Sequence, residues 1–170
     1  MSPSASVSES ASASISPSVS PSVSPSASPS ASPSEGYQGY TRGNYDVLPA
    51  NDDDLETAYT AQNLIDVATK DDVRVGQAAV QEHMVHQYKD YIGANNFCTL
   101  EWEGQTTLAP TSSTVYLQIY NRNTTTWDTV DSDNTSSADV DFILTGTVAD
   151  LTDYKDGNTV IACRIYQEAV

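Results

Sequence analysis

Hydrophobic and polar residues alternate along most of the chain beyond residue 72, in short runs separated by polar clusters. Successive side chains of a β-strand point to opposite faces of its sheet, so this period of two predicts half-buried strands. The runs cover Val73/Val75, 84–92, Leu100/Trp102, 115–119, Trp127/Val130, 140–144 and 161–165. Short strands that recur about every 8 to 12 residues are typical of sandwiches and barrels. The pattern therefore predicts an all-β fold, an antiparallel β-sandwich of the jelly-roll type.

The clearest unit is a predicted hairpin over residues 114–131. The side chains that alternate along its first strand are Val115, Leu117 and Ile119 on one face and Tyr116, Gln118 and Tyr120 on the other. A polar loop follows over 121–126, and Trp127 and Val130 belong to the second strand. A single helix is expected, of one or two turns within residues 53–67. Its weak apolar stripe consists of Leu55, Ala58, Tyr59 and Gln62.

The hairpin motif V-x-L-x-I-Y-N, followed by a polar turn and W-x-x-V, resembles the central strands of jelly-roll modules of the galactose-binding-like and carbohydrate-binding kind. Such modules occur on bacterial and phage surface proteins, and the resemblance covers about residues 72–168. It implies a fold and an exposed location, and it carries no catalytic residue onto this chain.

Residues 1–35 differ from the rest, because serine occupies every even position from 2 to 34 and a four-residue Ser-Pro repeat begins at Ser16. Proline fixes φ, lacks an N–H and restricts the preceding residue, which predicts an extended arm. The arm is either an O-glycosylated stalk or an unmodified linker. The serines taken as glycosylation candidates are Ser18, Ser22, Ser26 and Ser30. We therefore divide the chain into a Ser/Pro stalk (1–35), a Gly/Tyr/Asp-rich lead-in (36–71) and a β-sandwich (72–170).

The chain is strongly acidic, with 7 Lys and Arg against 23 Asp and Glu and a formal charge of −16 at pH 7. Nucleic acids and anionic lipids are bound through Lys/Arg surfaces, so neither is an expected partner. Without a run of about 20 apolar residues, membrane insertion is not expected, and the first residues lack the features of a secretory signal. A repetitive arm ahead of a β-module resembles the stalk-and-head proteins of bacterial surfaces. We therefore expect the cell exterior or the surface of a virion.

Cys98 and Cys163 both lie in predicted strands, and neighbouring strands would allow a disulfide. Two buried free thiols are the alternative. His83 and His86 are three residues apart, which on a strand places them on opposite faces and argues against shared metal binding. Glu101 and Glu103 share a strand face, the arrangement of a solvated face and also of paired hydrolytic carboxylates.

Acidic loop residues are candidates for a structural calcium site, because Ca²⁺ is bound by carboxylate and carbonyl oxygens. We name Asp52, Asp53 and Asp54 as its candidate ligands, with a solvated acidic surface as the alternative. No other cofactor is expected. The sequons at Asn123 and Asn134 are candidates for N-glycosylation where the source glycosylates proteins.

Four aromatic residues are candidates for a sugar-stacking platform: Tyr88, Tyr116, Tyr120 and Trp127. Packing in the core and under loops is the alternative for these residues. No nucleophile, P-loop or dinucleotide-binding motif is present in the sequence, so we do not expect an enzyme. The sequence favours an extracellular structural module whose head self-associates in a surface layer, fibre or virion appendage. The alternative is an adhesin that binds glycans through exposed aromatic rings.

Overall fold

Eight strands and one short helix make up residues 39–168, the part of the chain that the computed structural model describes. In chain order they are β1 (Gly39–Tyr45), β2 (Thr57–Ala58), α1 (Ala61–Asp66), β3 (His83–Tyr91), β4 (Cys98–Gly104), β5 (Val115–Asn121), β6 (Thr126–Asp133), β7 (Phe142–Val148) and β8 (Val160–Glu168). All paired strands are antiparallel, so the predicted all-β, antiparallel fold is confirmed. The predicted Ser/Pro arm lies outside the described residues.

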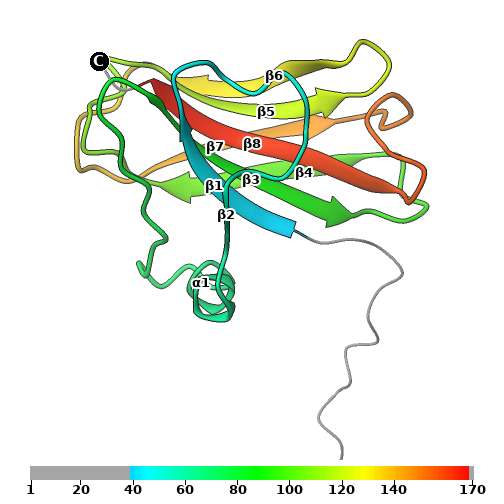
Figure 1. Ribbon diagram of the computed structural model, residues 1–170, viewed down its shortest axis with the longest axis horizontal. Coiled ribbons are helices and arrows are strands. Elements are labelled where there is room, and N and C mark those ends of the chain that lie inside the picture. Colours follow the sequence, from blue (N-terminus) through cyan, green and yellow to red (C-terminus); the bar gives the residue numbers. More distant parts are fainter. Residues whose placement is uncertain (1–38, 169–170) are drawn as a thin grey trace, which may run out of the picture. The chain divides into compact units, whose positions relative to one another are not determined.

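The strands form a six-stranded sheet in the order β2-β1-β3-β8-β5-β6 and a two-stranded sheet of β4 and β7 (Figure 1). Three of the pairs are nested in the sequence: β5 with β6, β4 with β7 and β3 with β8. The innermost pair is the hairpin predicted over 114–131, and its loop lies where the sequence placed it.

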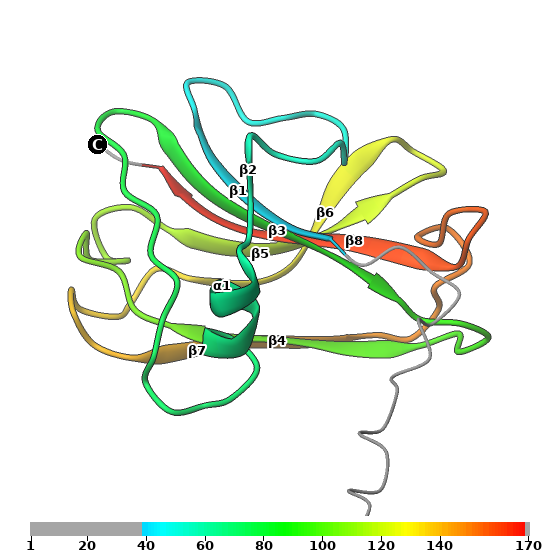
Figure 2. The same ribbon diagram turned by 60° about the horizontal axis from the view of Figure 1, so that its bottom comes forward.

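The two sheets face one another across a shared apolar core, and Figure 2 shows β4 and β7 in a layer below the larger sheet. Leu144 of β7 packs in one buried cluster with Val115, Leu117 and Ile165 of the larger sheet. A second cluster joins Cys98, Ile119, Leu151 and Ile161. The inward positions of β5 are thus Val115, Leu117 and Ile119, as the alternation predicted.

The outer face of the large sheet is covered by the loop between β1 and β2, residues 46–56. The Gln87 side chain on β3 donates to the carbonyl oxygens of Asp52 and Asp53, at 3.1 and 2.8 Å. Arg164 on β8 donates to the carbonyl oxygen of Pro49 at 2.8 Å. Buried polar groups need such partners, so these bonds fix the loop on the sheet.

Residues 39–71, the described part of the predicted lead-in, are not separate from the sandwich. β1 pairs with β3 along its whole length, from Gly39 opposite Lys89 to Tyr45 opposite His83, and so belongs to the large sheet. The boundary predicted at residue 72 is therefore wrong for the described residues. The run around Val73 and Val75 forms no strand, because it lies in an exposed connection between α1 and β3.

The predicted short helix is confirmed as α1, which has six residues. Thr60 caps it, since its side chain accepts a hydrogen bond from the backbone N–H of Asn63, and the Asn63 side chain accepts one from the backbone N–H of Thr60. None of its residues is buried, and three of the four predicted stripe residues precede it. Within residues 39–168, no helix has the length and apolar character to cross a membrane.

Candidate functional site

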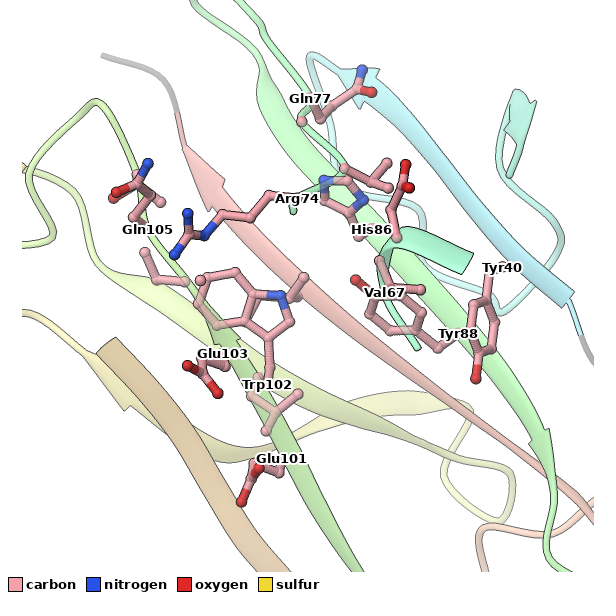
Figure 3. A pocket seen from close by; sticks show the side chains of 18 of the residues that line it. Tyr40, Val67, Arg74, Gln77, His86, Tyr88, Glu101, Trp102, Glu103 and Gln105 are labelled. Carbon is pink, nitrogen blue, oxygen red and sulfur yellow. The ribbon is translucent and has the colours of Figure 1, made fainter. Parts of the chain in front are cut away.

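A cleft of about 660 Å³ lies between the inner face of β1 and β3 and the edge of β4 (Figure 3). The two-stranded sheet is narrower than the six-stranded sheet and does not cover β1 and β3 completely. Residues of the segment 66–77 line the cleft there instead. The even positions of β3 share the inward face of the strand, so Met84, His86, Tyr88 and Asp90 all contribute to the wall.

Three tyrosines form one corner of the cleft. The rings of Tyr40, Tyr59 and Tyr88 meet edge to face, with centroid separations of 5.1 to 6.2 Å and interplanar angles of 81 to 89°. The Tyr59 hydroxyl is hydrogen-bonded to Nδ1 of His86, and the Tyr40 hydroxyl donates to Asp90 at 3.0 Å. Edge-to-face packing of this kind holds the rings in fixed orientations. The corner therefore presents fixed hydroxyl groups beside aromatic surface.

Burial sets the protonation of this corner. It raises the pKa of Tyr40, with a further contribution from the adjacent Asp90 carboxylate, and it raises the pKa of Asp90 itself. Burial also lowers the pKa of His86 from 6.5 to about 4, and the charge of Arg42 acts in the same direction. At neutral pH His86 is therefore an uncharged imidazole that hydrogen-bonds to Tyr59.

Trp102 on β4 forms the opposite wall and its ring lies along the strand toward Gly104. A Cβ atom on Gly104 would come within 2.4 Å of the Trp102 ring, so the indole needs a glycine at this position. Phe142, which is opposite Gly104 on β7, packs against the same ring at a centroid distance of 5.3 Å. These contacts fix an indole beside the cleft, the side-chain type that stacks on the apolar faces of ligands.

Gln167 is a buried polar residue of the cleft wall. It is only 2% exposed, and its amide nitrogen donates to the carbonyl oxygens of Leu108 and Ser113 at 2.9 and 2.8 Å. Its amide oxygen has no hydrogen-bond partner among the described residues and is itself inaccessible. Gln167 therefore holds the loop of Leu108 and Ser113 to β8 and offers no free group to a ligand in this arrangement.

The four predicted platform residues lie on two faces of the sheet. Tyr88 is in the cleft, whereas Tyr116, Tyr120 and Trp127 are on the outer face. There Tyr120 is buried against Trp127, and the Trp127 indole donates to the carbonyl oxygen of Asn51 in the covering loop. The prediction of one shared platform is therefore wrong, since Tyr88 lies on the other face, Tyr116 stacks on Tyr166, and Tyr120 and Trp127 pack against each other beside the covering loop.

The predicted calcium ligands bind protein groups of their own. Asp52 pairs with Arg122 at 2.8 Å and Asp54 pairs with Lys89 at 2.7 Å, while Asp53 accepts a hydrogen bond from the Asn51 side chain. Across residues 39–168, no three acidic, histidine or cysteine side chains gather in a way that could hold a metal ion. Asp52 and Asp54 thus tie the loop to Arg122 and Lys89, and the Asp53 carboxylate bonds within the loop.

The two cysteines are buried free thiols, in the alternative arrangement to the expected disulfide. The expectation required their strands to be neighbours, but Cys98 is on β4, which pairs with β7, and Cys163 is on β8 in the other sheet. Desolvation raises the pKa of both thiols. Neither is therefore activated as a nucleophile.

The predicted strand faces of the two histidines and of the two glutamates are confirmed. His83 and His86 are three positions apart on β3, so their side chains point to opposite faces of the sheet. Glu101 and Glu103 lie on the exposed face of β4, and both bond with Lys70. Asn123 and Asn134 are exposed in loop positions, and the four candidate serines lie outside the described residues.

The chain should lose stability in mild acid because of His86. The unfolded chain takes up a proton below pH 6.5, whereas the folded chain does so only near pH 4, so the free energy of unfolding falls as pH falls through this window. The slope is at most about 1.4 kcal/mol per pH unit. Urea unfolding at a series of pH values should show a shallower acid slope for His86→Gln than for the parent chain. Equal slopes would contradict the assignment, since Asp90, with its opposite effect, is common to both chains.

Only part of this site is predictable from the sequence. Tyr88 is among the predicted binding residues and Trp102 is not. The period of two on β3 is the signal that adds His86 and Asp90. Tyr40 and Tyr59 come from the segment expected to be a lead-in. Comparisons of the chain with protein-family models, curated proteins and solved structures find no match.

Proposed function

We propose that residues 39–168 form a non-enzymatic, extracellular binding module that takes a neutral saccharide in the cleft. The observation that carries this proposal is a cleft of about 660 Å³ whose wall combines the Trp102 indole with the rings and hydroxyls of three tyrosines. Small-molecule sites have volumes of about 300 to 1,000 Å³ and combine apolar walls with a few fixed polar groups. Sugar rings offer the matching chemistry, with apolar faces and a rim of hydroxyls.

The charge distribution favours an uncharged ligand. Lys70 and Arg74, the cationic side chains that line the cleft, are both paired with carboxylates. The polar groups deeper in the wall are hydroxyls, an uncharged imidazole and the carboxyl group of Asp90, and the chain as a whole carries −16. An anionic ligand would meet an unfavourable field, whereas a neutral one pays no such cost.

The strand pairing supports a finer assignment to the jelly-roll type of β-sandwich. A jelly roll is a long antiparallel hairpin that is rolled into two sheets, which makes its strand pairs nested in the sequence. Here β3-β4-β5 pairs in nested order with β6-β7-β8. This supports the resemblance of residues 72–168 to carbohydrate-binding modules, with β1 and β2 added at the edge of the larger sheet.

A binding role fits the carboxylates better than hydrolysis does. Glycoside hydrolases place two carboxyl groups on either side of the scissile bond. Glu101 and Glu103 instead lie side by side on the exposed face of β4 and share Lys70. Asp90 is hydrogen-bonded to Tyr40 within the wall.

Native electrophoresis through gels that contain a neutral polysaccharide tests the proposal, with a glucan, a galactan and a mannan used in turn. We expect one of them to retard the chain. Trp102→Ala should weaken this retardation about tenfold, because it removes the stacking surface. The matched control is Tyr116→Ala, an aromatic truncation on the outer face of the same domain that should leave retardation unchanged.

Two outcomes would contradict the proposal. If none of the polysaccharides retards the chain, a saccharide is not the ligand. If Tyr116→Ala abolishes retardation and Trp102→Ala does not, the binding site is the outer face.

A structural role in self-assembly is the second candidate, favoured by apolar side chains exposed on α1 and after it. These are Leu64, Ile65, Val67 and Val73. Edge-strand pairing is a less suitable mechanism, because β2 has two residues and the edge strand β6 carries Asp128, Asp131 and Asp133. Electron microscopy of the full chain distinguishes the candidates, since filaments or regular oligomers would support assembly.

A further inference from the structure

The segment that lines the cleft on its open side has few attachments along its middle. Residues 67–75, which we call the strap, lead from α1 toward β3 and border the cleft opposite Tyr88 and Trp102 (Figure 3). Figure 2 shows this connection running across the open side between the two sheets. Every residue from 67 to 74 is exposed, so the strap contributes little to the buried core.

The chain is tied to β1 before α1 and again after the strap. On the side before α1, the Tyr59 backbone N–H donates to the carbonyl oxygen of Tyr40 at 2.8 Å. After the strap, the Arg42 and Asn44 side chains donate to the carbonyl oxygens of Gly76 and Ala78. The Gln77 side chain also donates to the side-chain oxygen of Asn44, at 2.7 Å. The strap and α1 together therefore lie between two points of attachment to β1.

The middle of the strap is held to the smaller sheet by ion pairs. Lys70 bonds with Glu101 and lies 3.4 Å from Glu103, both on β4. Arg74 pairs at 2.7 Å with Asp141, immediately before β7, and at 3.0 Å with Asp72 in the strap itself. In the described part of the chain, no backbone hydrogen bond joins residues 67–75 to a strand.

These ion pairs form a latch that is weak and sensitive to salt. The Lys70 side chain is 63% exposed, and exposed pairs contribute little to stability because water and dissolved ions screen them. Val67 and Val73, which belong to the strap, are already 38% and 50% exposed, so opening the strap uncovers little of their apolar surface. Figure 3 shows Arg74 extending from the strap toward the side of the cleft where Trp102 lies.

We propose that the strap is a lid over the cleft, latched to the smaller sheet by Lys70 and Arg74, and that breaking this latch opens the way to Trp102. The role of the lid in controlling saccharide entry rests on the proposed function. Its movement does not, because opening can be measured on Trp102 without any ligand.

Acrylamide quenching of Trp102 fluorescence tests the lid. In a Trp127→Phe chain, Trp102 is the remaining tryptophan. Adding Lys70→Met and Arg74→Met should raise the quenching constant about twofold at low salt, since the latch is removed. Raising the NaCl concentration to about 0.5 M should produce the same rise in the chain that keeps the latch, and little further rise in the latch variant.

Two controls separate lid opening from general loosening. Lys155→Met removes a positive charge whose hydrogen bond goes to the carbonyl oxygen of Asn95, away from the strap, and should leave quenching unchanged. In a Trp102→Phe chain, quenching of Trp127 should not respond to the latch substitutions.

The possible outcomes all decide the question. Quenching of Trp102 that ignores both the latch substitutions and salt would overturn the lid, as would an equal response of Trp127. If the latch variants open the cleft and no polysaccharide binds, the lid stands and the saccharide proposal fails.

Discussion

Replacing Leu144 with alanine should lower the free energy of unfolding by about 3 kcal/mol. Leu144 is 2% exposed on β7 and packs against Val115, Leu117 and Ile165 of the facing sheet. Because β4 and β7 form a sheet of only two strands, their attachment depends on contacts across the core. Truncation removes apolar burial and leaves a cavity that a packed interior fills only in part.

The matched control is Ile143→Ala, one residue earlier on the same strand. Ile143 is 52% exposed, so its truncation should cost less than about 1 kcal/mol. Urea unfolding followed by circular dichroism measures both values. Equal losses for the two variants would mean that the two sheets are not joined through Leu144.

The strands that the sequence predicted best are those with one apolar and one polar face. On β5, Val115, Leu117 and Ile119 are nearly inaccessible to solvent, as the alternation required. The turn clusters located the ends of β5 and β6 because residues 121–126 offer side-chain hydrogen bonds to a turn. Asn121 Oδ1, for example, accepts from the backbone N–H groups of Asn123 and Thr124.

β1 was missed because neither of its faces is apolar. Its buried positions are Thr41 and Gly43, and the Cβ position of Gly43 is filled by the Tyr45 ring, which would lie 2.7 Å from an added atom. Thr41 accepts a hydrogen bond from the backbone N–H of Leu55, 14 residues away. A strand that is buried by a tyrosine ring and a loop has no alternation of apolar and polar residues, so the hydrophobic pattern does not reveal it.

The candidate site was predictable one strand at a time, but not as an assembly. The face shared by His86, Tyr88 and Asp90 follows from the sequence once β3 is accepted as a strand. That Trp102 forms the opposite wall depends on which sheet β4 joins, and no local pattern determines this. The cysteines illustrate the same limit. Their predicted disulfide assumed that β4 and β8 are neighbours, but the two strands belong to different sheets.

The outer face depends on a single buried cation, which makes Arg164 the second critical position. It is 5% exposed on β8, and it donates to the Gln118 side-chain oxygen at 2.9 Å and to the Pro49 carbonyl oxygen at 2.8 Å. Its guanidinium group lies 4.2 Å from the centre of the Trp127 ring. Burial lowers the pKa of Arg164 to about 10, so the group is still charged at neutral pH. It has no ion-pair partner within the described residues.

Arg164→Ala should lower the free energy of unfolding by about 3 kcal/mol, because two buried acceptors lose their donor and the contact with Trp127 disappears. Arg164→Met keeps most of the side-chain volume and should cost about 2 kcal/mol. The same substitution at the exposed Arg74 should cost less than about 1 kcal/mol, since its ion pairs are screened by water. Urea unfolding gives the three values.

Hydrogen exchange adds a readout that general destabilisation would not reproduce. Arg164 is one of the groups that hold residues 46–56 on the sheet. Compared with the parent chain, both Arg164 variants should therefore show a larger increase in exchange rate in this loop than in β4 and β7, which Arg164 does not contact. The contrary result is an Arg164→Met chain as stable as its parent. It would mean that the desolvation of the guanidinium cancels its hydrogen bonds, as it does in many buried charged groups, and that the other contacts of the loop, such as those of Gln87 and Trp127, suffice to hold it.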